Sequence, residues 1–115
     1  MFLKGHCGNK SCEAYEGGYL LIQWGYRNGG VFDCFLNDED CRCPMCGGYV
    51  EPTNFGFFNT NYKVTGTKKA GKGKPLEKVD KPWKLIPEED GYTTFKDSDD
   101  NMVNWIKLII TVKRP

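Results

Sequence analysis

The feature that most constrains the fold of this chain is a turn bounded by two cysteines, Cys43-Pro44-Met45-Cys46-Gly47-Gly48. A Cys-x-x-Cys spacing places two thiolates close enough to bind one metal ion. Pro44 fixes its own φ and lacks an amide hydrogen, which favours the turn. The two glycines that follow can adopt positive φ, so the backbone can fold its amides toward sulfur. The turn therefore predicts one half of a metal site.

The other half is predicted at Cys7-Gly8-Asn9-Lys10-Ser11-Cys12, a second short loop of turn-forming residues between two cysteines. A structural zinc ion is held by four Cys or His ligands in a tetrahedron. Two such loops far apart in sequence are typical of the two knuckles of a zinc ribbon, a knuckle being a short turn that carries two ligand cysteines. We therefore predict a structural zinc ion bound by Cys7, Cys12, Cys43 and Cys46.

Three other residues are alternative ligands: His6 beside the first loop, Cys41 beside the second, and Cys34 further upstream. A histidine next to a ligand loop is more often a neighbour than a ligand, and isolated cysteines are more often ordinary thiols. Six cysteines in an oxidising compartment would instead suggest three disulfides. The first residues lack the apolar core of a signal peptide, and no apolar run reaches transmembrane length. We therefore expect an intracellular protein without a membrane span, in which the cysteines bind metal.

The composition favours a β fold. The chain has 115 residues, with 14 glycines, six prolines and 14% aromatic residues, so it contains many turns and has enough length for one domain with a modest core. No long amphipathic helical pattern and no internal repeat is present. We predict a mainly β fold, either a small antiparallel sheet or an open barrel, in which residues 1–115 form one zinc-stabilised domain.

Individual strands follow from the apolar pattern. Residues 19–24 form an apolar run of strand length, which predicts a strand covered on both faces. The Asn28-Gly29 pair predicts a hairpin turn that leads into a returning strand at 31–36. Residues 61–65 alternate, with Tyr62 and Val64 toward the core. The clearest strand is 105–112, with one apolar face formed by Ile106, Leu108, Ile110 and Val112.

A basic segment at about residues 67–82 contains lysine, glycine and proline and little that can be buried, which predicts a flexible loop. Between residues 63 and 84 there are eight lysines and only two carboxylates, although the whole chain carries a net charge of +1. Trp83, Leu85 and Ile86 then return the chain to the fold, and residues 88–100 are acidic. The candidate binding residues of the basic loop are Lys68, Lys69, Lys72 and Lys74.

A wider pattern of residues covers nearly the whole chain: Gly5, Cys7, Asn9, Cys12, Ala14, Tyr15, Phe32, Asp33, Cys43, Pro44, Met45, Cys46, Pro52, Gly56, Phe57, Tyr62, Gly66, Asn104, Trp105 and Leu108. In this pattern the chain resembles a little-characterised, cysteine-rich, zinc-ribbon-like module of protist and fungal proteins, sometimes found beside ubiquitin-like domains. Members often carry two further cysteines, at places that are Phe55 and Thr60 here, and this departure favours Cys7 and Cys12 as the partners of the second knuckle. The resemblance implies a zinc-stabilised binding or scaffold module and names no reaction.

We weigh three classes of function. Catalysis is disfavoured, because an all-thiolate zinc site is closed and the one histidine lies beside a ligand. RNA contact through the basic loop is an alternative, as in a ribonucleoprotein, although arginine is scarce. The leading expectation is a non-catalytic interaction or scaffold domain that serves as an accessory subunit of a larger assembly. Its partner protein is expected to contact the basic loop, the acidic segment or an edge strand at 62–65. A role in the ubiquitin system rests on the resemblance alone.

Overall fold

The computed structural model describes residues 1–95 and 105–115. The acidic residues Asp97, Asp99 and Asp100, and Asn104 of the resemblance, lie outside the described residues. The strands, in chain order, are β1 (Phe2–Cys7), β2 (Tyr19–Gln23), β3 (Val31–Asp33), β4 (Val50–Phe57), β5 (Thr60–Lys68), β6 (Glu77–Asp80), β7 (Lys84–Ile86), β8 (Thr93–Thr94) and β9 (Trp105–Lys113). Four short 3-10 turns lie between them: η1 (Glu13–Glu16), η2 (Asn28–Gly30), η3 (Asp38–Asp40) and η4 (Glu88–Asp90).

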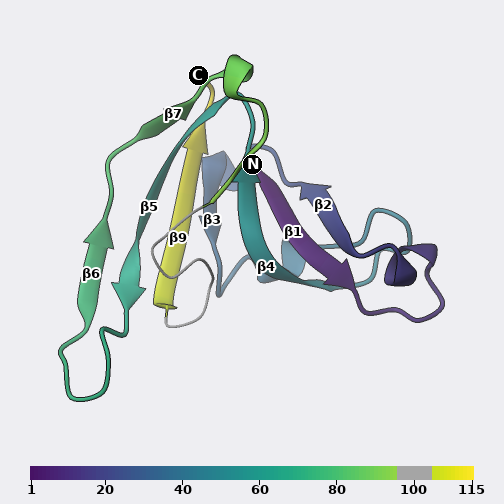
Figure 1. The fold of residues 1–115 in the computed structure, drawn as a ribbon, viewed down its shortest axis with the longest axis horizontal. Coiled ribbons are helices and arrows are strands. Elements are labelled where there is room, and N and C mark those ends of the chain that lie inside the picture. The colour runs from purple at the N-terminus through teal and green to yellow at the C-terminus, as the bar shows by residue number, and fades with distance from the viewer. Residues whose placement is uncertain (96–104) are drawn as a thin grey trace.

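The described strands form two antiparallel sheets that do not close into a barrel (Figure 1). One sheet has the order β2-β1-β4-β8, and the other has the order β3-β9-β5-β6, with β7 also pairing to β5. This architecture confirms the predicted mainly β class. The long strands β5 and β9 pair over eight positions and form the centre of the second sheet.

The core is a chain of aromatic rings between the two sheets. Trp24 and Phe32 meet edge to face with ring centroids 5.2 Å apart, and Phe32 contacts Phe55 in the same way at 5.7 Å. Phe55 in turn meets Phe95 at 6.2 Å. Edge-to-face contacts of this kind add to the free energy gained by burying the rings. The core therefore links the end of β2, strands β3 and β4 and the end of β8 into one packed unit.

Two predictions for the first half of the chain are wrong. The strand at 19–24 was expected to be covered on both faces, but β2 is an edge strand that pairs only with β1, and Leu21 is 50% exposed. Asn28 and Gly29 do adopt positive φ, but the turn does not form a hairpin. It carries the chain from β2 to β3, and β3 pairs with β9 in the other sheet.

The long strands also correct the predicted pattern. Leu108, Ile110 and Val112 are buried as expected, but Ile106 is 44% exposed and Trp105 is buried in its place. The register between β5 and β9 shifts between Thr67 and Lys68, so one residue of β9 is left unpaired. Such a bulge inverts the alternation of side chains beyond it.

The predicted loop at 67–82 is partly a strand. Within it, β6 pairs with β5, so the connection that remains is the hairpin loop 69–76. Strand β5 has β9 on one side and β6 and β7 on the other, so the prediction of an edge strand at 62–65 is wrong. Of the three residues at which the chain was expected to return to the fold, Ile86 is buried, while Trp83 and Leu85 are exposed.

Candidate metal centre

The two cysteine loops are brought together by the pairing of β1 with β4. Cys7 is the last residue of β1 and lies opposite Val50, the first residue of β4. The second loop is closed by two backbone bonds: the Cys43 amide donates to the Gly48 carbonyl, and the Gly47 amide donates to the Cys43 carbonyl, both at 2.8 Å. Gly47 adopts a φ of 72°, as predicted, whereas Gly48 has no positive φ. A single strand pair thus positions both knuckles.

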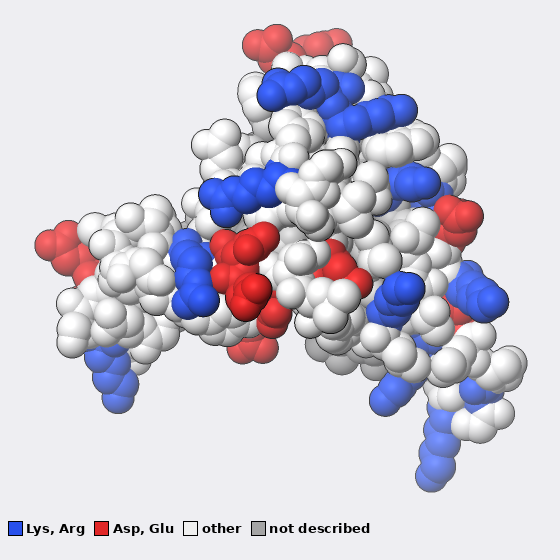
Figure 2. All heavy atoms as spheres, turned by 180° about the vertical axis from the view of Figure 1, so that it is seen from behind, with Lys and Arg blue, Asp and Glu red and all other residues white. Residues whose placement is uncertain are grey.

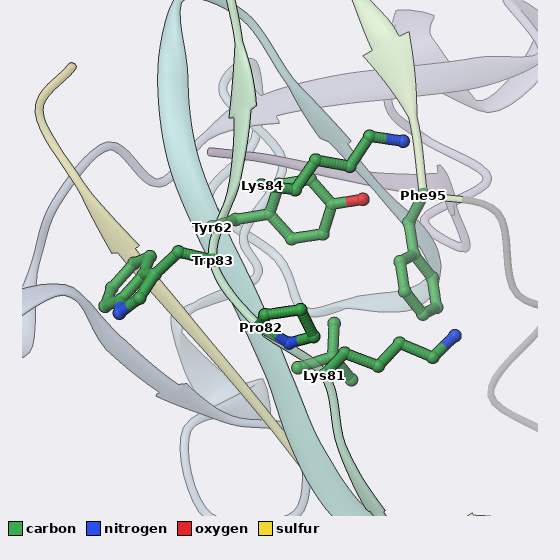
Figure 3. A pocket seen from close by; sticks show the side chains of 7 residues that line it. Tyr62, Lys81, Pro82, Trp83, Lys84 and Phe95 are labelled. Carbon is green, nitrogen blue, oxygen red and sulfur yellow. The ribbon is translucent and has the colours of Figure 1, made fainter.

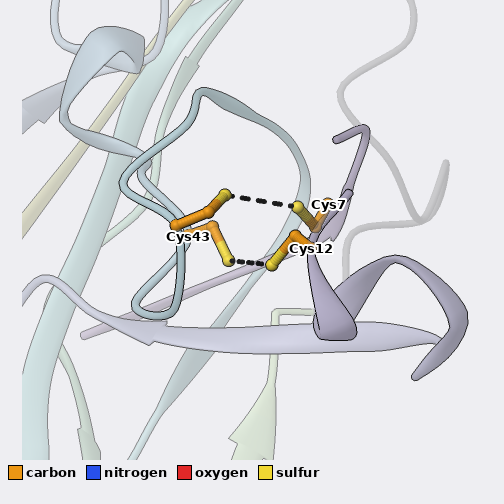
Figure 4. A group of neighbouring side chains, drawn as sticks. Cys7, Cys12 and Cys43 are labelled. Atoms are coloured by element: carbon orange, nitrogen blue, oxygen red, sulfur yellow. Dashed lines mark hydrogen bonds between the residues drawn. The ribbon is translucent and has the colours of Figure 1, made fainter. Parts of the chain in front are cut away.

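The four predicted sulfur atoms form one compact group. Those of Cys7, Cys12, Cys43 and Cys46 all lie within 4.8 Å of one another. The Cys7–Cys46 and Cys12–Cys43 sulfur pairs, each joining one knuckle to the other, are 3.8 Å apart (Figure 4). A disulfide requires about 2.05 Å, so these pairs are not bonded. A tetrahedron with metal–sulfur distances of about 2.3 Å has edges of about 3.8 Å, and the group therefore fits one metal ion.

Backbone amides point at three of the four sulfurs. The Gly48 amide donates to the Cys46 sulfur at 3.4 Å, and the amides of Asn9 and Ala14 donate in the same way to Cys7 and Cys12. In each case the donor lies two residues after its cysteine. Hydrogen bonds of this type stabilise a thiolate and orient it as a ligand. These donors were not predicted individually, although their regular spacing was a signal available in the sequence.

The electrostatic interactions among the four cysteine sulfurs favour a bound cation. The Gly48 amide, followed by the Asn9 side chain, lowers the pKa of the Cys46 thiol to about 6. The Ala14 amide acts in the same direction on Cys12, but burial and the nearby sulfurs of Cys46 and Cys43 outweigh it and raise the pKa of Cys12 to about 12. Four thiolates so close together repel one another unless a positive ion lies between them.

The three alternative ligands lie outside this group. His6 is exposed, because strand alternation places it on the face of β1 opposite Cys7, and its ring meets Tyr15 at 5.6 Å. Cys34 and Cys41 are buried in the apolar core. Burial is the main cause that raises the pKa of the Cys34 thiol, and it raises the pKa of Cys41 to about 11, so both stay protonated near neutral pH.

The four lysines named as binding residues are not equivalent. Lys69, Lys72 and Lys74 are exposed in the hairpin loop between β5 and β6. Lys68 is 5% exposed at the end of β5, with its amino group 5.0 Å from the centre of the Trp105 ring. Figure 2 shows basic side chains along the edge of the molecule where this hairpin lies, down to its tip. Only three of the four lysines are therefore available at the surface.

The fold and this site define a class: a mainly β protein with four clustered cysteines that could hold a metal ion. Comparisons with protein-family models, with curated proteins and with solved structures found no match to this chain. The likeness to a cysteine-rich module stays a prediction. In the part of the chain that the structure describes, no helix has the length and apolar character needed to cross a bilayer.

Proposed function

We propose that this chain is a non-catalytic, zinc-binding interaction module in which the metal fixes the shape of a surface that a partner protein recognises. The observation that carries the proposal is the tetrahedral spacing of the four cysteine sulfurs. Four protein sulfurs fill all positions of a tetrahedral ion, so no site is left for a substrate or a reactive water. Such a centre contributes to folding rather than to catalysis.

Zinc is the metal that we propose, with Cys7, Cys12, Cys43 and Cys46 as its ligands. Tetrahedral sites with four thiolates bind zinc or iron. Zinc would supply a redox-inert cross-link between the loop after β1 and the loop before β4. The test is to purify the protein in reductant without added metal and to determine zinc and iron by elemental analysis. We expect one zinc per chain and loss of the folded state in a strong chelator. Metal-free protein that stays folded in chelator and reductant contradicts the proposal.

Two further features support a non-catalytic role. The buried thiols of Cys34 and Cys41 have raised pKa values, which disfavours the thiolate that nucleophilic catalysis needs. His6, which could act as a base, packs against Tyr15 at the surface, and the structure does not bring it into the sulfur group.

An RNA-binding role is a second candidate, and the observation that favours it is the exposure of Lys69, Lys72 and Lys74 on one projecting hairpin loop. Lysines in such a loop can neutralise phosphates, and binding of that kind weakens steeply with salt. Changing all three lysines to glutamine separates the two roles. If RNA is the ligand, single-stranded RNA binds the unaltered protein at low salt and not the altered one; if the loop only keeps the protein in solution, RNA binding is absent from both.

A further inference from the structure

A surface groove lies on the second sheet, between β5, the segment before β7 and the end of β8. It has a volume of about 320 Å³. Its origin is local: β6 and β7 both pair with β5, and the Lys81 amide still donates to the Val64 carbonyl at 2.9 Å. The next residue, Pro82, has no amide hydrogen, so regular pairing ends there and the chain departs from β5. The space left beside Val64 is the groove.

The inner surface of the groove is apolar. Val64 and Phe95 are 1% and 3% exposed and form buried parts of its wall. Tyr62 completes the wall and is itself fixed, because its ring stacks on Phe57 with centroids 3.9 Å apart and planes 6° from parallel. The volume lies at the lower end of the range of ligand pockets, about 300–1,000 Å³. This combination fits a single large apolar side chain.

The rim of the groove is basic. Figure 3 shows Lys81 and Lys84 extending on two sides of the space between Pro82 and Phe95. Within residues 1–95 and 105–115, no carboxylate forms an ion pair with Lys84. The amino group of Lys84 therefore favours a ligand that carries negative charge.

The same surroundings distinguish a peptide from a nucleobase. A base binds by stacking on the open face of an aromatic ring. Here the Tyr62 ring is stacked on Phe57. The ring of Trp83 is directed away from Phe95 (Figure 3). The amino group of Lys113 lies 4.1 Å from the centre of the Trp83 ring. One face of the Tyr62 ring is therefore covered, and the Trp83 ring points away from the groove, which favours an apolar side chain over a stacked base.

We propose that this groove binds an acidic peptide segment of a partner protein, with one large apolar side chain seated against Val64 and Phe95 and a carboxylate beside Lys84. The proposal names the partner class for the interaction role inferred above and rests on it. The two are tested separately, because the groove lies on the second sheet and the sulfur group lies at the end of the first.

The test is fluorescence anisotropy of a labelled peptide, Glu-Asp-Leu-Asp-Glu, titrated with the zinc-loaded full chain. We expect a dissociation constant below about 1 mM. Reversing the charge of one exposed rim residue, Lys84→Glu, should weaken binding roughly threefold to tenfold. The matched control Lys72→Glu makes the same charge change in the hairpin loop and should alter binding by less than about twofold. A peptide with serine in place of leucine should bind more weakly, and zinc content and circular dichroism verify that each variant is folded.

Besides the absence of peptide binding, three results overturn the proposal. The first is binding that is equally strong in Lys84→Glu or with the serine peptide. The second is displacement of the peptide by a single-stranded oligouridine, which would assign the groove to nucleic acid. The third result concerns the aspartates that follow Phe95 in sequence, and it uses the combined variant Asp97→Asn, Asp99→Asn, Asp100→Asn. If this variant binds the peptide more than about tenfold more tightly than unaltered protein, the groove is assigned to the chain's own acidic segment. Zinc-loaded protein that binds no peptide refutes the groove alone, whereas folded protein without zinc refutes the metal proposal alone.

Discussion

The sharpest test of the metal centre is Cys46→Ser, because Cys46 is an exposed residue. Replacing an exposed sulfur by oxygen removes little buried apolar surface, so without a metal the change should cost almost nothing. With zinc bound, the change removes one of four ligands. Structural zinc sites contribute about 10–16 kcal/mol, so one ligand accounts for roughly a quarter of that, about 2.5–4 kcal/mol. For a domain of this size the loss corresponds to a fall in Tm of about 10–16 °C.

The matched control is Cys41→Ala, a change at a fully buried cysteine outside the sulfur group. Removing one buried sulfur should cost about 1 kcal/mol through lost burial and a small cavity. Burial alone therefore predicts that Cys41→Ala is the more harmful change, and metal binding predicts the opposite order. Thermal melts followed by circular dichroism, with zinc quantified in each sample, measure that order.

Chelation gives a second comparison, between unaltered protein and Cys46→Ser. In chelator, unaltered protein and Cys46→Ser should give the same circular dichroism spectrum, that of the unfolded chain, because neither holds zinc. The reasoning is refuted if zinc-loaded Cys46→Ser melts within about 2 °C of unaltered protein, or if it is less harmful than Cys41→Ala.

Three further predictions concern the core. Stability should fall as pH rises above 9.0, because burial raises the pKa of the Cys34 thiol and the unfolded chain then loses that proton first; urea unfolding at about pH 8 and about pH 9.8 measures the loss. Thr60→Val should cost about 1–2 kcal/mol in urea unfolding, because the buried hydroxyl lies 2.7 Å from the Tyr26 hydroxyl. Asp40→Ala should cost about 1–2 kcal/mol and shift the indole N–H resonance of Trp24, which donates to Asp40 Oδ2 at 3.1 Å.

Each of these has its own control. Cys34→Ala should reduce the pH dependence, and an unchanged slope would assign the effect to another group. In a double-mutant cycle, Tyr26→Phe should cost little once Thr60 is already valine; fully additive costs would show that the two hydroxyls do not interact. For Asp40→Ala, an indole resonance that does not move would show that the bond to Trp24 is absent in solution.

The candidate ligands and the fold class could be read from the sequence, because both depend on short spacings. Two cysteines separated by two or four residues must lie in one turn, and an alternating apolar pattern favours a strand wherever that strand later pairs. The lysines of the loop between β5 and β6 were found in the same way. The alternating pattern gives the wrong burial where a strand contains a bulge, as at Ile106. A bulge depends on pairing with the neighbouring strand, so the local periodicity of the sequence does not reveal it.

Only the tertiary structure decided which strands are neighbours and what lies between them. The turn at Asn28 has hairpin chemistry, yet β3 joins β9, because pairing depends on how the two sheets pack around Phe32 and Phe55. Burial of Lys68, exposure of Trp83 and the groove beside Val64 follow from contacts between segments far apart in the chain. The sequence determined what each short stretch can do by itself. The packing of the sheets determined which of those stretches meet, because long-range contacts depend on the shape of the whole core.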